Sequence, residues 1–433
     1  MGSPVIWFDA TTIKRLRNQS PAGLSRAEAH SLAGALKFDA ERVGFSCYNR
    51  YQNVMEKLAR SEVEALLAGY GHSGRQGHGA RRPQKNLLLR ALREIERRIR
   101  AGSRRTLGHA KQWLPWDTKL VRFNPGDIFV LSGATWDMVD ATVLEKMINR
   151  GGACLVVLVA DMIPWRFPHQ YQSEQAVFRF LRLAELAARR ASLVLSISRT
   201  TSEDFVEFAS SVGVKPGRME VIHLGANSPA PQATQPAGMP EDLLSRGYVL
   251  SVSTIQVRKN HQLLYQLWRR FAEEGRDSIP RLVLVGSHGW LTDDLLIQIR
   301  TDPKVRDSII VLNSVDDMEL SWLYGHAKFT LYPSLYEGWG LPIVESLQHS
   351  TPCLASNTSS MPEASQGLAT HLDPLDFMTW RQEIIRRFED PSVLVLETEW
   401  IRARFRPRSW QDFSNDFADR VWSLANSSSN GVV

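Results

Sequence analysis

The sequence predicts an α/β protein built from two doubly wound parallel sheets. Short apolar runs alternate with segments of helical periodicity along the chain, which is typical of parallel sheets covered by helices. The alternation is interrupted by a proline-rich stretch, residues 228–240, and then restarts. With 433 residues, the chain is long enough for two or three domains, each with its own core. We therefore expect two sheet domains joined by a linker.

The apolar runs give the expected strands in order. Most contain several β-branched or large apolar residues and are bounded by turn-forming residues, as buried strands are. Two sets of five runs flank the linker, and they predict domains at 1–235 and 236–400, followed by a terminal segment, 401–433. The expected strands are residues 5–9, 127–132, 153–160, 193–197 and 219–223, then 248–252, 281–286, 308–312, 329–333 and 352–356.

The terminal segment contains a helix signal. Ser409 can cap a helix, and Asp412 three residues later can complete a capping box. The helix should run from Trp410 to Leu424. Its apolar stripe consists of Phe413, Phe417, Val421 and Leu424.

Composition gives a soluble globular class and an expected compartment. The chain is 43% hydrophobic and 23% charged, and no apolar run reaches the roughly 18 residues of a membrane-spanning helix. The first residues lack the pattern of a signal peptide. The three cysteines, Cys47, Cys154 and Cys353, are far apart and odd in number, which favours a reducing compartment. We expect a cytoplasmic protein.

One segment is strongly basic. Residues 75–111 contain twelve Lys or Arg and two Glu, whereas the whole chain has a net charge of +6. Leu88, Leu92, Ile95 and Ile99 form an apolar stripe, so residues 85–105 are expected to be a basic amphipathic helix. Such a helix suits an anionic membrane surface, and the alternative is a solvated helix packed on its own domain. No nucleic-acid-binding motif accompanies the charge, so we expect no nucleic-acid partner.

The segment from Tyr332 to Leu347 carries the strongest functional signal. A short strand ends at a proline, and a helix is expected to begin near Pro342. The free N–H groups and dipole of a helix start favour a phosphate, and a carboxylate can accept hydrogen bonds from a sugar diol. Glu337 and Glu345 flank this helix start, so the segment suits a nucleotide sugar. The expected donor-binding residues here are Gly338, Trp339, Gly340, Leu341 and Glu345.

Three further loops follow expected strands. Ligands of doubly wound sheets bind beyond the carboxyl ends of strands. Arg258 and Lys259 follow the strand at 248–252 and can neutralise a pyrophosphate. In the first half, Gly23 lies in a loop that opens a helix, and Asp161 follows the most apolar strand.

These motifs together resemble the retaining glycosyltransferases of family 4, which have the two-domain GT-B fold. Glu337, the seven residues after it and Glu345 resemble the family's E-x7-E signature, in a wording similar to its mannosyltransferase-like members. The resemblance implies that Arg258 and Lys259 hold the donor diphosphate, that Glu337 holds sugar hydroxyls and that Glu345 holds the ribose. It also implies that the last helix crosses back onto the first domain.

The resemblance extends to the first domain with one departure. Gly23 resembles the family's glycine loop, facing donor phosphates and acceptor, and Asp161 its Asp-x-x-Pro element, with a role in acceptor positioning or proton uptake. Many relatives have His before that Asp, where this chain has Ala160. The expected catalytic residues are therefore Asp161, Arg258, Lys259 and Glu337, with no metal, because no Asp-x-Asp motif follows a strand.

The function that the resemblance implies is retaining transfer of a sugar from a nucleotide-diphosphate donor, with GDP-mannose as the best single choice. The acceptor would be a polysaccharide or a lipid-linked oligosaccharide, met at the cytoplasmic face of a membrane. The alternative from another class is a catalytically silent GT-B protein that acts as a nucleotide-sugar sensor or assembly platform. An epimerase or a phosphorylase of the same fold is a further alternative.

Overall fold

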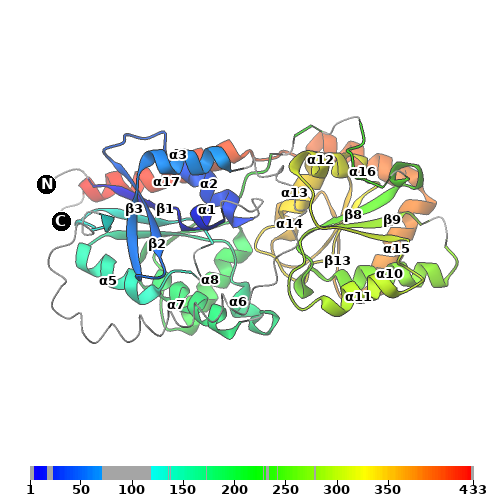
Figure 1. The fold of residues 1–433 in the computed structure, drawn as a ribbon, viewed down its shortest axis with the longest axis horizontal. Helices are drawn as coiled ribbons and strands as arrows, with labels where there is room; N and C mark the ends of the chain where they lie inside the picture. Colours follow the sequence, from blue (N-terminus) through cyan, green and yellow to red (C-terminus); the bar gives the residue numbers. More distant parts are fainter. Residues whose placement is uncertain are drawn as a thin grey trace, which may run out of the picture.

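The computed structural model describes residues 4–16, 23–70, 119–134, 136, 138–171, 173–227, 229–230, 234–240, 242–276 and 279–430. These residues form two lobes, each built on one sheet with helices on both faces (Figure 1). The expected α/β class with two doubly wound sheets is confirmed.

The first sheet has the strand order β3-β2-β1-β4-β5-β6-β7. Neighbouring strands are parallel except for the edge pair β2 and β3. Its strands are β1 Ile6–Asp9, β2 Val43–Asn49, β3 Val54–Leu58, β4 Ile128–Leu131, β5 Cys154–Val159, β6 Ala191–Ser196 and β7 Arg218–Val221.

The period of two along the strands decides which helices cover each face. In β4, Ile128 and Val130 pack with α2 and with the last helix, α17 Trp410–Asn430, whereas Phe129 and Leu131 pack with α5, α7 and α8. Both faces are therefore buried, as parallel sheets require. The helices of this lobe are α1 Thr11–Leu16, α2 Leu24–Ala35, α3 Arg60–Gly69, α5 Ala141–Gly151, α6 Ile163–Arg166, η4 Pro168–Gln170, α7 Glu174–Arg190 and α8 Arg199–Ser211.

The structure contains a hairpin, β2 and β3, that the sequence patterns did not predict. Both strands mix polar and apolar residues, because the hairpin lies at the edge of the sheet and is only partly covered. The turn between them uses Asn53 at φ 59°, a left-handed conformation that Asn tolerates. The other unexpected strand, β13 Thr370–Leu372, has three residues and also lies at a sheet edge.

The second sheet is parallel throughout, with the order β10-β9-β8-β11-β12-β13. In β9, Leu282 and Leu284 pack with α10, α11 and α15, whereas Val283 and Val285 pack with α12. The remaining elements are β8 Tyr248–Val252, β9 Arg281–Val285, β10 Ile309–Leu312, β11 Thr330–Tyr332, β12 Cys353–Ser356, α9 Leu243–Arg246, η5 Val257–Lys259, α10 His261–Glu273, α11 Asp293–Thr301, α12 Asp317–His326, α13 Leu341–Gln348, α14 Met361–Ala364, α15 Phe377–Glu389 and α16 Pro391–Arg404.

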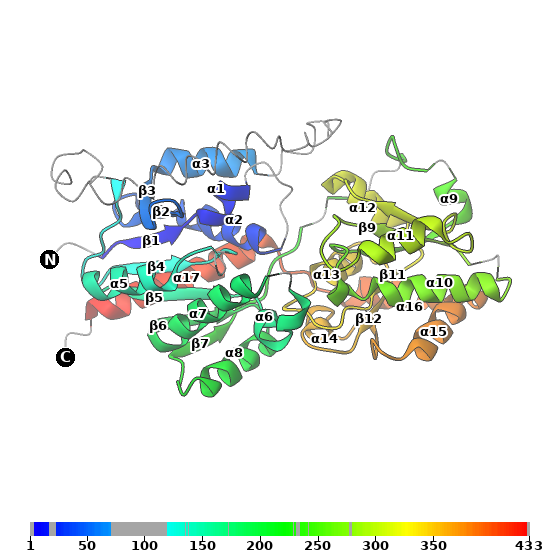
Figure 2. The same cartoon turned by 60° about the horizontal axis from the view of Figure 1, so that its bottom comes forward.

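The last helix, α17 Trp410–Asn430, returns to the first lobe, where it lies beside α2 (Figures 1 and 2). Ser409 and Asp412 form the expected capping box, since each backbone N–H donates to the other's side chain at 3.0 Å. Phe413 and Phe417 are fully buried, and Trp410 stacks on His30 at 4.6 Å between ring centroids. The last helix therefore ties the chain end to the first domain.

Two segments predicted from the sequence, the basic helix and the linker, are not described in full by the structure. The basic segment 85–105 is outside, and the linker 228–240 is described only at 229–230 and 234–240. Within the described part of the chain, no helix combines the length and the apolar character needed to cross a bilayer.

Candidate active site

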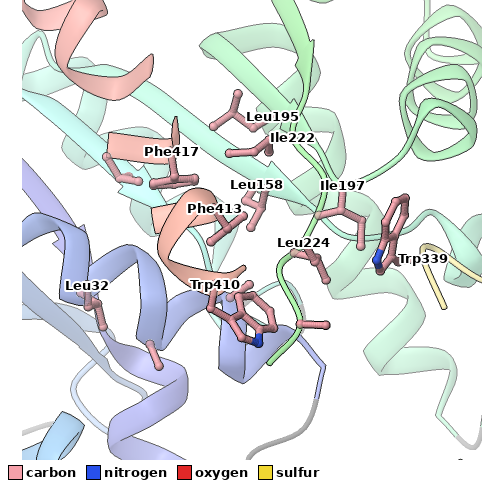
Figure 3. Packing of buried hydrophobic residues seen from close by; sticks show 14 of the residues in the cluster. Leu32, Leu158, Leu195, Ile197, Ile222, Leu224, Trp339, Trp410, Phe413 and Phe417 are labelled. Atoms are coloured by element: carbon pink, nitrogen blue, oxygen red, sulfur yellow. The ribbon is translucent and has the colours of Figure 1, made fainter. Parts of the chain in front are cut away.

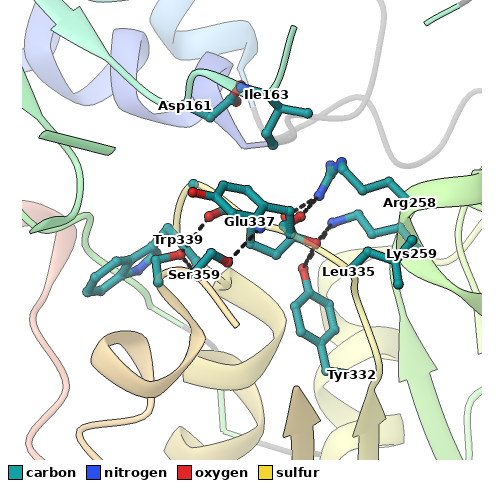
Figure 4. A network of polar contacts seen from close by, with 12 residues as sticks. Asp161, Ile163, Arg258, Lys259, Tyr332, Leu335, Glu337, Trp339 and Ser359 are labelled. Atoms are coloured by element: carbon teal, nitrogen blue, oxygen red, sulfur yellow. Dashed lines mark hydrogen bonds and ion pairs between the residues drawn. The ribbon is translucent and has the colours of Figure 1, made fainter. Parts of the chain in front are cut away.

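A buried ion cluster joins the loop after β8 to the loop after β11 (Figure 4). Lys259 Nζ lies 2.5 Å from Glu337 Oε1, and Arg258 Nη1 lies 2.8 Å from Glu337 Oε2. The Tyr332 hydroxyl donates to Glu337 Oε1 at 3.0 Å. Two cations thus share one carboxylate, so the cluster keeps one positive charge in excess.

Burial and charge shift the titration of this cluster. Burial alone would raise the pKa of Glu337, but the charges of Arg258 and Lys259 lower it to about 2. Burial lowers the pKa of Lys259 to about 8, against the opposing effect of the Glu337 charge. Glu337 is therefore a carboxylate throughout the neutral range, whereas Lys259 loses its proton in the mildly alkaline range.

The backbone around η5 places the two cations. Asn260 has φ 56°, a left-handed conformation that turns the chain from η5 into α10. The backbone N–H of Leu335 donates to the Arg258 carbonyl at 2.9 Å, which fixes the two loops to each other. Arg258 also donates through Nη1 to the Tyr336 carbonyl. The pairing of Arg258 and Lys259 with Glu337 was not expected from the sequence, because the residues are 78 and 79 positions apart.

Gly338 lies against the first domain. A Cβ atom built on Gly338 would come within 2.0 Å of the Ala160 carbonyl oxygen and 2.9 Å of the Asp161 Cβ. The Thr201 hydroxyl lies 3.2 Å from the Ala160 carbonyl and 3.4 Å from the Gly338 carbonyl. Only glycine fits this contact between the domains.

Asp161 follows β5 at this contact. Its Oδ1 accepts a hydrogen bond from the Ile163 N–H at 2.9 Å, which holds the side chain at the start of α6 (Figure 4). Burial raises the pKa of Asp161, and the charge of Arg258 opposes the shift. The structure therefore brings Asp161 of the first domain within the electrostatic reach of the buried cluster of the second.

Glu345 lies in α13 and faces a different set of groups. Arg26 Nη1 lies 3.2 Å from Glu345 Oε1, and the Tyr324 hydroxyl donates to Glu345 Oε2 at 3.0 Å. Arg26 Nη2 also lies 3.3 Å from Asp317 Oδ1, at the start of α12. These residues line a cavity of about 210 Å³ between the domains.

Arg26 is a site residue that the sequence reasoning missed. It lies in the first turn of α2, three positions after Gly23, which has φ 47° and precedes the helix. Its positive charge beside the Gly23 loop, a candidate phosphate-binding loop, was a signal in the sequence that could have identified it. Its partners Glu345 and Asp317 lie about 300 positions away, so their contact could not be read from the chain.

Trp339 packs into the contact between the domains (Figure 3). Its ring stacks on His223 at 4.7 Å between centroids, and it belongs to the same buried cluster as Ile197 and Leu224. His223 Nε2 lies 2.8 Å from Glu363 Oε1. The expected donor-binding role of Trp339 stays a prediction.

Gly340 and Leu341 form the start of α13. Gly340 has φ 137°, which favours glycine, and Leu341 is the first helical residue. Pro342 is the second helical residue, where its missing N–H costs no intrahelical hydrogen bond. The donor-binding roles of Gly338, Gly340, Leu341 and Gly23 also stay predictions. Across the described ranges, no group of three or more His, Cys, Asp or Glu side chains has the arrangement of a metal site.

Comparison with known proteins gives a family match in the second domain. Residues 243–389 match the model of the family "Glycosyl transferases group 1". The O-antigen chain mannosyltransferase B of Escherichia coli is 34% identical over 167 residues, which cover 39% of this chain and 43% of that protein. The O-antigen chain mannosyltransferase RfbU of Salmonella typhimurium is 24% identical over 231 residues, 53% of this chain and 59% of that protein. The chain thus spans about half the length of these relatives.

Solved structures resemble the whole chain. The Anabaena protein Alr3699/HepE, solved with UDP and glucose, has a TM-score of 0.60 at 15% identity and covers 97% of this chain and 100% of its own. The sucrose-phosphate synthase of Thermosynechococcus elongatus also has a TM-score of 0.60, at 17% identity, and covers 98% of this chain and 100% of its own. The expected GT-B fold is confirmed.

Proposed function

We propose that this chain transfers a hexosyl group from a nucleoside-diphosphate sugar to a hydroxyl group. The match of residues 243–389 to the glycosyl transferases group 1 and the mannosyltransferase relatives support this proposal. The single observation that carries the proposal is that the buried cluster of Arg258, Lys259 and Glu337 faces Asp161 of the other domain closely enough for their charges to interact.

The cluster suits the leaving diphosphate. The bond between the sugar C1 and the phosphate oxygen breaks, and negative charge develops on the diphosphate. Arg258 and Lys259 retain N–H groups beyond those bound to Glu337, and their excess positive charge is fixed before reaction. The positive end of the α13 dipole, at Leu341, adds to this potential.

The carboxylates hold the sugar side of the donor. In the proposal Glu337 accepts hydrogen bonds from donor-sugar hydroxyls, and Glu345 holds the ribose diol in place of Arg26. The acceptor hydroxyl forms the new bond to C1 with retention of configuration. Its proton passes to the leaving phosphate or to Asp161, whose pKa is raised by burial. The proposed chemistry uses no resident metal.

GDP-mannose is the proposed donor, supported by the mannosyltransferase names of the relatives. The proposed acceptor is a growing glycan or a lipid-linked oligosaccharide, reached at the cytoplasmic surface of an anionic membrane. A thermal-shift screen of nucleotide sugars tests the donor, because a ligand at 100 times its Kd adds about 2.7 kcal/mol of stability. Stabilisation by UDP-glucose but not by GDP-mannose would refute the proposed base and sugar.

Arg258→Ala tests the role of the cluster. It should raise the activation free energy by about 2–4 kcal/mol and so lower turnover about 30- to 900-fold, because a preorganised charge is lost where charge develops. The measurement is kcat with the donor found in the screen. The matched control is Arg402→Ala, an exposed arginine on α16. Normal turnover in Arg258→Ala would exclude the proposed role, and donor binding without any transfer would favour a nucleotide-sugar sensor.

A further inference from the structure

A second cavity, of about 410 Å³, lies beside Asp161. Four aromatic side chains line it together with small apolar residues, and it differs from the cavity at Glu345 in its charge, since that cavity is lined by Arg26. No lysine or arginine is among the described residues that line it. The lining residues that matter here are Trp136, Ala160, Asp161, Tyr171, Phe180 and Trp290.

Two aromatic pairs form these walls. Trp136, after β4, and Phe180, in α7, lie 5.4 Å apart between ring centroids. Tyr171, before α7, and Trp290, after β9, lie 5.9 Å apart. Three of the four rings come from the first domain, and Trp290 comes from the second.

Trp290 completes the cavity from across the domain contact. Its indole Nε1 donates to the Gln170 carbonyl at 2.6 Å, which fixes the ring against the first domain. The cavity is therefore complete only when the two domains are together. Asp161 lines it and also feels the charges of Arg258 and Glu337, so it lies between the ion cluster and the aromatic walls.

We propose that this cavity receives the terminal hexopyranose ring of the acceptor, an assignment that rests on the proposed glycosyl transfer. A pyranose ring has apolar C–H faces and a rim of hydroxyl groups. Aromatic walls with one carboxylate match both, because apolar pockets with a few placed polar groups fix the orientation of small ligands. Asp161 would then orient the attacking hydroxyl.

The same features disfavour other occupants. A nucleoside diphosphate needs cations, and the described lining offers none. An isoprenoid chain would cover the Asp161 carboxylate and offer it no hydrogen bond beyond the one from the Ile163 N–H, which is costly. The volume lies within the range of about 300–1,000 Å³ typical of small-ligand pockets.

The test measures binding of simple pyranosides by NMR titration. The probes are methyl α-mannopyranoside, methyl α-glucopyranoside and, as the lipid probe, farnesyl phosphate. Trp290→Leu should raise the Kd of the better pyranoside about tenfold, and Trp290→Phe should raise it less, because an aromatic face remains. Ala176→Leu, in α7, adds volume inside the cavity and should also weaken binding. Trp400→Leu, a half-exposed tryptophan on α16, is the control and should change nothing.

Three results separate the outcomes. The assignment would be overturned if the pyranoside Kd were the same in the parent protein, Trp290→Leu and Ala176→Leu. It would also be overturned if Trp290→Leu weakened the binding of farnesyl phosphate but not of either pyranoside. Thermal melting of each variant shows whether it is folded. Calorimetry with GDP and UDP tests the donor side separately. If no nucleotide binds and no sugar is transferred, the proposed function fails even where pyranoside binding depends on Trp290.

Discussion

At the scale of single residues, Glu337 is the centre of the buried ion cluster. It neutralises one of the two buried cations beside it and leaves the other charge available to a ligand. Removing one partner of such a buried pair usually costs about 3–5 kcal/mol, because the remaining charge loses its compensation. Glu337 therefore contributes to folding as well as to the proposed donor site.

Lys259 should set an alkaline limit to the reaction, that is, a pH above which kcat/KM for the donor falls. Because burial lowers its pKa to about 8, Lys259 is charged below that pH and neutral above it. Donor affinity should therefore fall as the pH rises through about 8. Lys259→Arg should move this limit to higher pH, since arginine stays charged. The measurement is kcat/KM for the donor from pH 6 to 9.5.

Lys304→Arg is the control for that profile, since Lys304 is exposed on the second domain. It should leave the alkaline limit in place. An unchanged limit in Lys259→Arg would show that another group titrates there.

At the scale of elements, α2 places the carboxylate of Glu28 in the buried interior of the first lobe. Glu28 Oε1 accepts a hydrogen bond from the Ile13 N–H at 3.0 Å, near the buried Asp9. Burial raises the pKa of Glu28 to about 8 and that of Asp9 to about 7. The folded state thus holds protons that these two groups release in the unfolded chain near their ordinary pKa values of 4.5 and 3.8.

Glu28→Gln should make the protein less sensitive to alkaline pH. The folded state binds more protons than the unfolded state between about pH 4.5 and 8, so the free energy of unfolding falls as the pH rises through that range. The amide cannot ionise, so the variant should lose much of this decline. Urea unfolding at pH 5.5 and 8 measures it. Glu203→Gln, exposed on α8, is the control; equal slopes in both variants would refute the prediction.

The loop after β11 depends on a glycine contact. Gly338→Ala puts a methyl group within 2.0 Å of the Ala160 carbonyl, so the loop or the domains must shift. We expect at least a tenfold loss of turnover, since a displacement of about 1 Å can cost a hundredfold. Gly69→Ala, where no atom lies within 4 Å of the added Cβ, should be neutral. Parent-like turnover in Gly338→Ala would show that the domains are apart during reaction.

At the scale of the whole molecule, several polar contacts join the two domains in this arrangement. Arg26 contacts Glu345 and Asp317, and the Arg199 N–H donates to Glu363 at 3.0 Å. The first of these contacts occupies the carboxylate assigned to the ribose. A donor that binds Glu345 must therefore displace Arg26, which couples donor binding to the domain contact.

Arg26→Gln should favour separation of the domains in the ligand-free protein. Loss of a partly exposed ion pair is worth about 1 kcal/mol, which changes the ratio of closed to open molecules about fivefold. Energy transfer between dyes on the two lobes measures the change. Arg60→Gln, whose partner Glu64 lies in the same helix, is the control. A closed population unaffected by Arg26→Gln would show that other contacts hold the domains.

Local sequence patterns were enough to predict much of the fold. The apolar runs that became β5 and β8 are continuous because both faces of those strands are buried. The edge strands β2 and β3 lack that signature, and their pairing depends on a neighbour supplied by the fold. The end of α17 was placed six residues early, at Leu424 instead of Asn430, because the polar residues that follow the apolar stripe continue the helix.

The sequence by itself determined the fold class, the two βα loops with Arg258, Lys259, Glu337 and Glu345, and the candidate Asp161, because strand periodicity and loop chemistry are local properties. Only the tertiary structure decided that Glu337 pairs with both cations, that Arg26 meets Glu345 and that Trp290 completes an aromatic cavity. These contacts join residues from distant parts of the chain. Their existence depends on how the strands are ordered and how the domains pack, which no local pattern encodes.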